Sequence, residues 1–311
     1  MSNQGIGTAT GKIILMGEHA VVYGEPAIAF PFGGTQVRAT LTLSEENKLT
    51  SVYHEGALSD VPESLTNIQQ LTNKLQKHLA TPNFHLTIES SIPAERGMGS
   101  SAAVAVAITR AFFNWQVQKL TQDELLHWVD FSEAIAHGNP SGIDAAATSG
   151  DSPIYFKRDF PFEAFPLNID AYLLVADTGI KGQTRSAVRS VADLMEKHPE
   201  EISGIVHQIG QLTKQAKTAI MNNQAPLLGQ LMTQAQEKLH QLKVSNEMLD
   251  DLVTIALNQG ALGAKLTGGG RGGCLLVLTD TKEQAQQIIQ AFKTYGVKDV
   301  WLQGLGVHQH V

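Results

Sequence analysis

The sequence contains a single cysteine, which excludes an internal disulfide. Cys274 lies in the apolar run C-L-L-V-L, where a buried structural thiol is favoured over a nucleophile. Basic residues are in the minority: 23 Lys and Arg face 30 Asp and Glu, for a formal net charge of −7. This charge leaves no broad basic field for nucleic acid or anionic lipid, so any phosphate site must be local.

Long hydrophobic runs are also missing. No uninterrupted apolar run approaches the ~18 residues that span a bilayer, and the opening M-S-N-Q-G-I-G-T lacks a charged-then-apolar leader pattern. We therefore expect a cytoplasmic protein without membrane contact. The 311 residues are 42% hydrophobic and 17% charged, an ordinary globular composition that is long enough for two cores.

The most informative segment, residues 93–101, reads P-A-E-R-G-M-G-S-S. It follows an alternating strand pattern at 84–89 and precedes an alanine-rich helix pattern at 101–115. Gly97 and Gly99 would let the backbone approach an anion, and the start of the helix favours negative charge. Ser101 adds a hydroxyl suited to Mg²⁺ or a phosphate oxygen. The segment therefore predicts a phosphate loop.

Two other interpretations fit the same residues. G-M-G-S-S-A loosely satisfies the dinucleotide fingerprint, but it follows nearly a hundred residues of chain, and Asp123 and Glu124 fall at a helix start rather than at a strand end. A plain strand-to-helix turn would need the same glycines for its geometry. The chain contains no G-x-x-x-x-G-K-[ST], so the loop is not a P-loop.

Periodicity divides the chain into a β-rich opening, a mixed middle and a largely helical second half. We expect strands at 9–16 and 37–43, a hairpin or loop at 44–60, and helices at 64–79, 101–115 and 121–136, the last opened by a capping box from Thr121 to Glu124. A buried strand at 171–177 is followed by helices over 184–259, and then by a strand, a glycine loop, a strand, a helix and a strand. The aromatic and proline-rich stretch after Tyr155 places the domain boundary at 170/171.

Three segments gather ionisable residues. In the first, Lys12 begins the apolar run I-I-L-M, and Glu18 and His19 follow it. A buried ammonium needs a partner. The alternative is that Lys12 extends to solvent and that the other two lie in a surface turn.

The second segment, E-A-I-A-H-G-N-P-S-G-I-D, carries Glu133 late in a helix and Asp144 just past a tight break. Two acids at this spacing can converge, one on a metal and one on a substrate hydroxyl. The alternative is local: Ser141 and Asp144 fit a capping box, Glu133 fits a solvated helix residue, and His137 fits a cation near a helix C-terminus.

The third segment, K-L-T-G-G-G-R-G-G at 265–273, is a second glycine-rich loop between two strands. So many glycines suggest a close approach to something, such as a polyphosphate, and a flexible connector is the alternative. The polar loop 177–185, D-T-G-I-K-G-Q-T-R, leaves a buried strand, where loops often line sites.

Together these segments resemble the galactokinase, homoserine kinase, mevalonate kinase and phosphomevalonate kinase (GHMP) superfamily over almost the full chain. The motifs stand here as G-K-I-I-L-M-G-E-H-A-V-V-Y-G, P-A-E-R-G-M-G-S-S-A-A and K-L-T-G-G-G-R-G-G-C, in the order of that family. G-E-H-A-V-V-Y-G and H-G-N-P-S-G-I-D are similar to its mevalonate kinase branch. Glu95 and Arg96 depart from the pattern, because many relatives have small residues there.

The resemblance implies ATP and Mg²⁺ as co-substrate and cofactor, and mevalonate as the acceptor of the phosphoryl group. It implies that Asp144 and Lys12 are catalytic and that Ser101 and Glu133 are metal ligands. The acceptor site would contain Lys12, Glu18, His19, Asp144 and Thr184. The nucleotide site would contain Pro93, Glu95, Arg96, Gly97, Met98, Gly99, Ser100 and Ser101.

The fold implied is α+β with two domains and the active site in the cleft. The N-terminal domain, 1–170, would resemble the second domain of ribosomal protein S-five, and the C-terminal domain, 171–311, would have split β-α-β character. In relatives the last strand can return to the first domain, and 304–311 is the candidate here. The family is often dimeric, so a homodimer is also implied.

Three rival hypotheses remain open. The first is a sister kinase that acts on phosphomevalonate or galactose. The second is a non-catalytic sensor of the same fold, although such proteins tend to lose the acid or the lysine that this chain retains. The third is a nicotinamide oxidoreductase, which rests on the loose fingerprint alone.

Overall fold

The computed structural model describes residues 2–138 and 142–308. The chain folds into two compact units, each built from several stretches of sequence. The first contains residues 1–12, 31–93 and 99–151, and the second contains 13–30, 94–98 and 152–311. These units are discontinuous, so they do not correspond to a single cut at 170/171, and that domain boundary stays a prediction.

The first unit contains a mixed β-sheet, with both antiparallel and parallel strand pairs, and helices pack on it. Strand β5 (Phe84–Ser90) pairs antiparallel with the later part of β2 (Ala27–Leu43) and parallel with β3 (Lys48–Ser51), which forms a hairpin with β4 (His54–Ala57). Strand β1 (Gly5–Met16) also pairs with β2. On β5 the buried Phe84, Leu86 and Ile88 alternate with less buried neighbours, which confirms the strand expected there.

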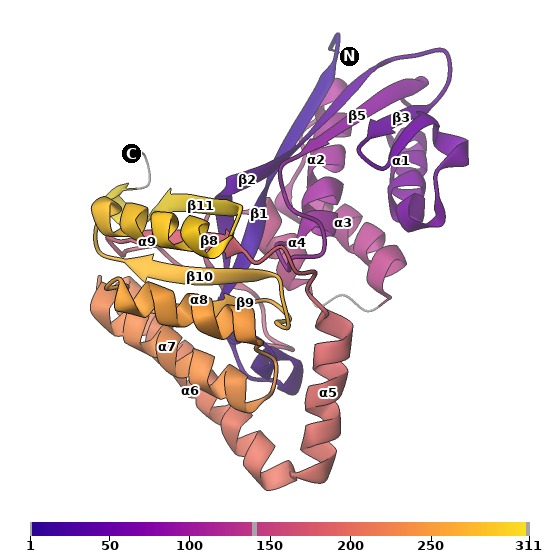
Figure 1. Cartoon of the computed structure of the whole chain (residues 1–311). Coiled ribbons are helices and arrows are strands. Elements are labelled where there is room, and N and C mark those ends of the chain that lie inside the picture. The colour runs from indigo at the N-terminus through magenta and orange to yellow at the C-terminus, as the bar shows by residue number, and fades with distance from the viewer. Residues whose placement is uncertain (1, 139–141, 309–311) are drawn as a thin grey trace. The chain divides into compact units, whose positions relative to one another are not determined.

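Helix α2 (Ser100–Trp115) packs against α1 (Thr66–Leu79), α3 (Gln122–His137) and α4 (Ile143–Ser149), as Figure 1 shows. Its alanines are buried, and they allow the neighbouring helices to pack closely. The predicted capping box is confirmed: the Thr121 side chain accepts from the Glu124 backbone N–H, and the Glu124 side chain accepts from the Thr121 N–H. Short 3₁₀ turns at Leu58–Asp60 and Glu63–Leu65 precede α1.

The second unit is built around a four-stranded sheet in the order β11-β8-β10-β9. Its strands are β8 (Tyr172–Asp177), β9 (Gly263–Thr267), β10 (Cys274–Thr279) and β11 (Asp299–Gly304), and all its pairs are antiparallel. Helices α7 (Ala225–Gln241), α8 (Glu247–Asn258) and α9 (Lys282–Tyr295) pack on this sheet (Figure 1). Helices α5 (Thr184–Lys197) and α6 (Pro199–Met221) complete the helical segment. The predicted order of strand, loop, strand, helix and strand is confirmed.

Residues from the start of the chain complete this second unit. The early part of β2, Ala27–Ala29, pairs with β6 (Ile154–Phe156), which pairs with β7 (Glu163–Ala164). The 3₁₀ turn Ala20–Tyr23 contacts α6, and Ala20 lies in the core that contains the apolar side chains of β8 and β10. The second core is therefore assembled from both ends of the sequence.

The described end of the chain lies beside β8, and the expectation that 304–311 returns to the first domain stays a prediction. The Leu305 N–H donates to the carbonyl of Ala171, the His308 ring stacks on Tyr172, and a 3₁₀ turn covers Gly306–His308. These residues lie in the second unit, and 309–311 lie outside the described residues. Among the helices that the structure describes, none is both long and apolar enough to cross a bilayer.

Candidate active site

Lys12 and Asp144 meet within the first unit. Lys12 lies on β1 and is 3% exposed, so it does not extend to solvent. Its Nζ is 3.0 Å from Asp144 Oδ1 in the first turn of α4, and the Asp144 side chain is 38% exposed. The pair therefore joins a buried cation to a carboxylate that is open to solvent. A carboxylate that is open to solvent at this position can accept a proton from a hydroxyl.

The local alternative for Asp144 was a capping box with Ser141. The N-cap of α4 is Gly142, in the left-handed region at φ 77°, and no side chain of the described residues is seen to cap the helix. Ser141, like Asn139 and Pro140 of the predicted break, lies outside the described residues. The observed contact of the Asp144 carboxylate is the one with Lys12.

A second pair lies in the same unit. Ser101 Oγ, in the first turn of α2, donates to Glu133 Oε1 at 2.5 Å, and Glu133 is 4% exposed near the end of α3. Burial raises the pKa of the Glu133 carboxyl, while the Ser101 hydrogen bond and the charge of nearby His137 oppose the shift. A dication next to Glu133 would stabilise the ionised carboxylate against the cost of burial. The two oxygens are hard donors, which suits Mg²⁺.

The glycines of the predicted phosphate loop adopt conformations that other residues rarely adopt. Gly99 has φ 68°, and a Cβ on it would lie 2.8 Å from Lys12 Cγ, so only glycine fits against the lysine stem. Gly97 has φ 78°. Ser100 opens α2, and the first N–H groups of a helix have no partner within it. These features fit a backbone that binds an anion.

The glycine-rich segment 265–273 lies in the second unit. Two alternate residues of it, Lys265 and Thr267, form hydrogen bonds with residues 14 and 18 of the first motif. Lys265 Nζ on β9 donates to Glu18 Oε1 and to the Leu266 carbonyl, and the lysine and the glutamate are 0% and 1% exposed. Thr267 Oγ1 donates to the Ile14 carbonyl at 2.9 Å and accepts from the Ile14 N–H at 3.1 Å. Alternate strand residues share a face, so the G-E-H segment lies along that face of the K-L-T strand.

Gly269 lies in the turn after β9 and contacts two predicted acceptor residues. Its carbonyl is 3.0 Å from His19 Nε2, and a Cβ on it would lie 2.4 Å from Thr184 Oγ1. Close backbone approach therefore explains a glycine at this position. Burial lowers the pKa of His19, as do the charges of Arg271 and Lys265, so the ring is neutral near pH 7 and donates through Nε2.

Arg96 and Glu95 are also placed in the second unit. The guanidinium of Arg96 donates to Asp177, Gly179 and Ala94, and Glu95 Oε2 pairs with Lys181 at 2.5 Å. Met98 is buried. Pro93 lies at the start of the loop, after β5, and belongs to the first unit.

The sequence reasoning missed the role of Lys265. It treated the glycine loop as an approach to polyphosphate, whereas the observed contacts of 265, 267 and 269 are with the first motif and with Thr184. The available signal was a lysine in an apolar strand, the same signal that singled out Lys12. Among the described residues, no cluster of three or more His, Cys, Asp and Glu side chains could hold a metal.

Comparisons with known proteins agree over the whole chain. Residues 66–151 match the model of the GHMP kinases N terminal domain, and 216–298 match the GHMP kinases C terminal model. The mevalonate kinase of Pyrococcus furiosus is 31% identical, with 98% of each chain covered, and that of Aeropyrum pernix is 32% identical, with 87% of each covered.

Solved structures give the same answer. The mevalonate kinase of methicillin-resistant Staphylococcus aureus is 32% identical with a TM-score of 0.75, and covers 98% of this chain and 100% of its own. The L. major mevalonate kinase in complex with R-mevalonate is 26% identical with a TM-score of 0.82, and covers 97% of this chain and 95% of its own.

Proposed function

This chain belongs to the GHMP kinases, and from that membership we propose that it is a mevalonate kinase, which transfers the γ-phosphoryl group of ATP to the C5 hydroxyl of mevalonate. Full-length relatives with that name support the acceptor. The single observation that supports the chemistry is the 3.0 Å contact between Lys12 and Asp144.

In this proposal Asp144 orients the acceptor hydroxyl and accepts its proton. The Lys12 ammonium lies beside this carboxylate and stabilises negative charge on the attacking oxygen. Phosphoryl transfer passes through a loose transition state, so positioning and charge neutralisation supply most of the catalysis. Glu18, His19 and Thr184 would position the acceptor.

Ser101 and Glu133 would hold Mg²⁺, and their two hard oxygens fit a cation that takes one or two protein ligands and completes its shell with phosphate and water. When bound, Mg²⁺ neutralises charge on the phosphate oxygens. The backbone N–H groups of Gly97, Gly99 and Ser100 would contact the phosphates.

The first experiment incubates the protein with ATP, Mg²⁺ and mevalonate and measures ADP and phosphorylated product. Galactose and phosphomevalonate are tested in parallel, and turnover of either without turnover of mevalonate would assign a sister kinase. Binding of mevalonate and ATP without turnover of any acceptor would assign a sensor.

The second experiment uses Asp144→Asn, which keeps the side-chain shape and removes the base. We expect kcat to fall on the order of 10²-fold or more. Asp193→Asn, on α5 and away from the residues placed in the site, is the matched control and should keep the wild-type rate. A normal rate for Asp144→Asn would remove this residue from the chemistry. The homodimer implied by the family stays a prediction that light scattering can check.

A further inference from the structure

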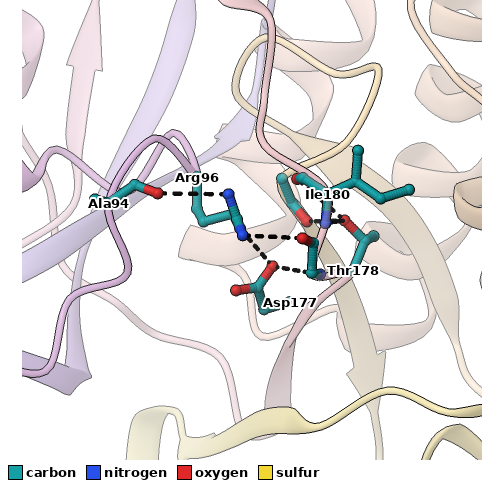
Figure 2. A network of polar contacts seen from close by, with 7 residues as sticks. Ala94, Arg96, Asp177, Thr178 and Ile180 are labelled. Atoms are coloured by element: carbon teal, nitrogen blue, oxygen red, sulfur yellow. Dashed lines mark hydrogen bonds and ion pairs between the residues drawn. The ribbon is translucent and has the colours of Figure 1, made fainter.

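Two loops of the second unit are fastened to each other. Residues 94–98 form the first part of the predicted phosphate loop, and residues 177–182 lead to Thr184 at the start of α5. Figure 2 shows the Arg96 guanidinium directed at the second loop: Nε donates to Asp177 Oδ1 at 2.7 Å and Nη2 donates to the Gly179 carbonyl at 3.1 Å. One side chain thus binds two successive parts of the opposite loop.

Glu95 adds a second attachment. Its carbonyl accepts from the Gly182 N–H at 2.9 Å, and its carboxylate pairs with Lys181 at 2.5 Å. Glu95 has φ 57°, a left-handed conformation that a residue other than glycine adopts only where its surroundings hold it. The attachment therefore constrains the backbone as well as the side chains.

The two ion pairs, Arg96–Asp177 and Lys181–Glu95, differ in how far they are buried. The Arg96 and Asp177 side chains are 13% and 8% exposed, whereas those of Lys181 and Glu95 are 76% and 59% exposed. Exposed pairs contribute little because water and salt screen them, while removing one partner of a buried pair leaves an uncompensated charge. Arg96 is therefore the principal element of the attachment.

The second loop is itself held in place by the glycine motif. The Thr178 N–H donates to the Gly273 carbonyl at 3.0 Å, and the Gly273 N–H donates to the Ile180 carbonyl at 2.8 Å. Asp177 Oδ1 also accepts from the Gly179 N–H at 2.8 Å. Arg96 consequently connects the phosphate-loop side to a loop that already has a defined shape.

We propose that Arg96 is a positioning residue that holds the predicted phosphate loop, residues 93–101, against the 177–182 segment. This contact would fix the distance and the orientation between the phosphate donor and the acceptor alcohol. This inference rests on the proposed function. The guanidinium donates to three protein acceptors, so it aligns the loop rather than binding phosphate.

The kinetic test compares the wild type with Arg96→Ala, Arg96→Lys and Asp177→Asn, with Arg158→Ala, at an exposed position, as the control. Misplaced reactants lower the chemical rate more than binding, so we expect Arg96→Ala to lower kcat about tenfold to a hundredfold while the Kd for ADP changes less than about threefold. Arg96→Lys can reach one acceptor at a time and should restore part of kcat. Arg96→Ala/Asp177→Asn should be no worse than Arg96→Ala, because the two residues act as a pair.

Two kinetic results would overturn the proposal. An unchanged kcat in both Arg96 variants would leave the pair with a stability role only. A rise of about tenfold or more in the Kd for ADP with kcat unchanged would make Arg96 a phosphate ligand. Should Arg96→Ala fold poorly, Arg96→Lys and Asp177→Asn carry the same test.

Amide hydrogen exchange supplies a readout that needs no phosphoryl transfer. In the wild type, ADP binding should slow exchange of the amides at 178–182, and Arg96→Lys should reduce that slowing clearly. Equal slowing in both proteins contradicts the proposal. If the wild type shows this coupling but does not phosphorylate mevalonate, the proposed function fails and the connection between the loops stands.

Discussion

Replacing Lys265 by methionine removes the ammonium that faces Glu18 while keeping most of the side-chain volume. Lys265 is 0% exposed and Glu18 is 1% exposed, so water cannot replace the lost partner. Removing one member of a buried ion pair costs about 3–5 kcal/mol, because the other charge stays behind. We expect Lys265→Met to lower the free energy of unfolding by about that amount, which is a large share of the roughly 5–15 kcal/mol typical of a folded domain.

Urea unfolding at pH 7 measures this loss. Lys298→Met is the matched control, since Lys298 is exposed and such substitutions usually change stability by less than about 0.5 kcal/mol. The double variant Glu18→Gln/Lys265→Met removes both charges and should be more stable than Lys265→Met alone, although the Leu266 carbonyl still loses its donor.

A loss below about 1 kcal/mol in Lys265→Met would refute the reasoning, because the buried Glu18 carboxylate would then not depend on the lysine ammonium.

Two further predictions concern neighbouring residues. Burial lowers the pKa of His19, so the stability that the neutral ring contributes is present above the unfolded pKa of ~6.5 and is lost as pH falls through the folded pKa. His19→Gln keeps a hydrogen-bond donor but removes the titrating group. Urea unfolding of this variant should therefore show a smaller fall in stability between pH 7 and pH 5 than the wild type shows. Gly269→Ala places a methyl group against Thr184 and should cost about 1–3 kcal/mol and raise the KM for mevalonate, whereas Gly204→Ala on α6, with nothing within 4 Å, should stabilise by up to about 1 kcal/mol. Wild-type KM and stability in the Gly269→Ala variant would contradict the close contact.

Local sequence signals predicted most elements because their physics is local. The capping box at Thr121 and the alternation on β5 need only neighbouring residues, and both are confirmed. Strand β2 was expected at 37–43 but begins at Ala27. Its first six residues are all buried, so they show no alternation, and a strand buried on both faces cannot be recognised by period.

The candidate site divides in the same way. The glycines and serines of 97–101 are adjacent in sequence, and their pattern predicted a phosphate loop. The contact of Lys265 with Glu18 joins residues 247 apart, and no spacing in the sequence announces it. The pairing of Lys12 with Asp144 followed from the family resemblance, because composition and period give no long-range partner.

The discontinuity of the second unit sets an order of assembly during synthesis. Residues 13–30 leave the ribosome first, yet the core that receives Ala20 includes Leu275 and Val277 of β10, which are made near the end. Chains fold from the N-terminus as they emerge, and contacts between distant residues form slowly because a long loop must close. The Ala20–Tyr23 turn therefore completes its packing only after β10 has been synthesised, and we expect nascent chains stalled before β10 to leave this turn accessible to chaperones.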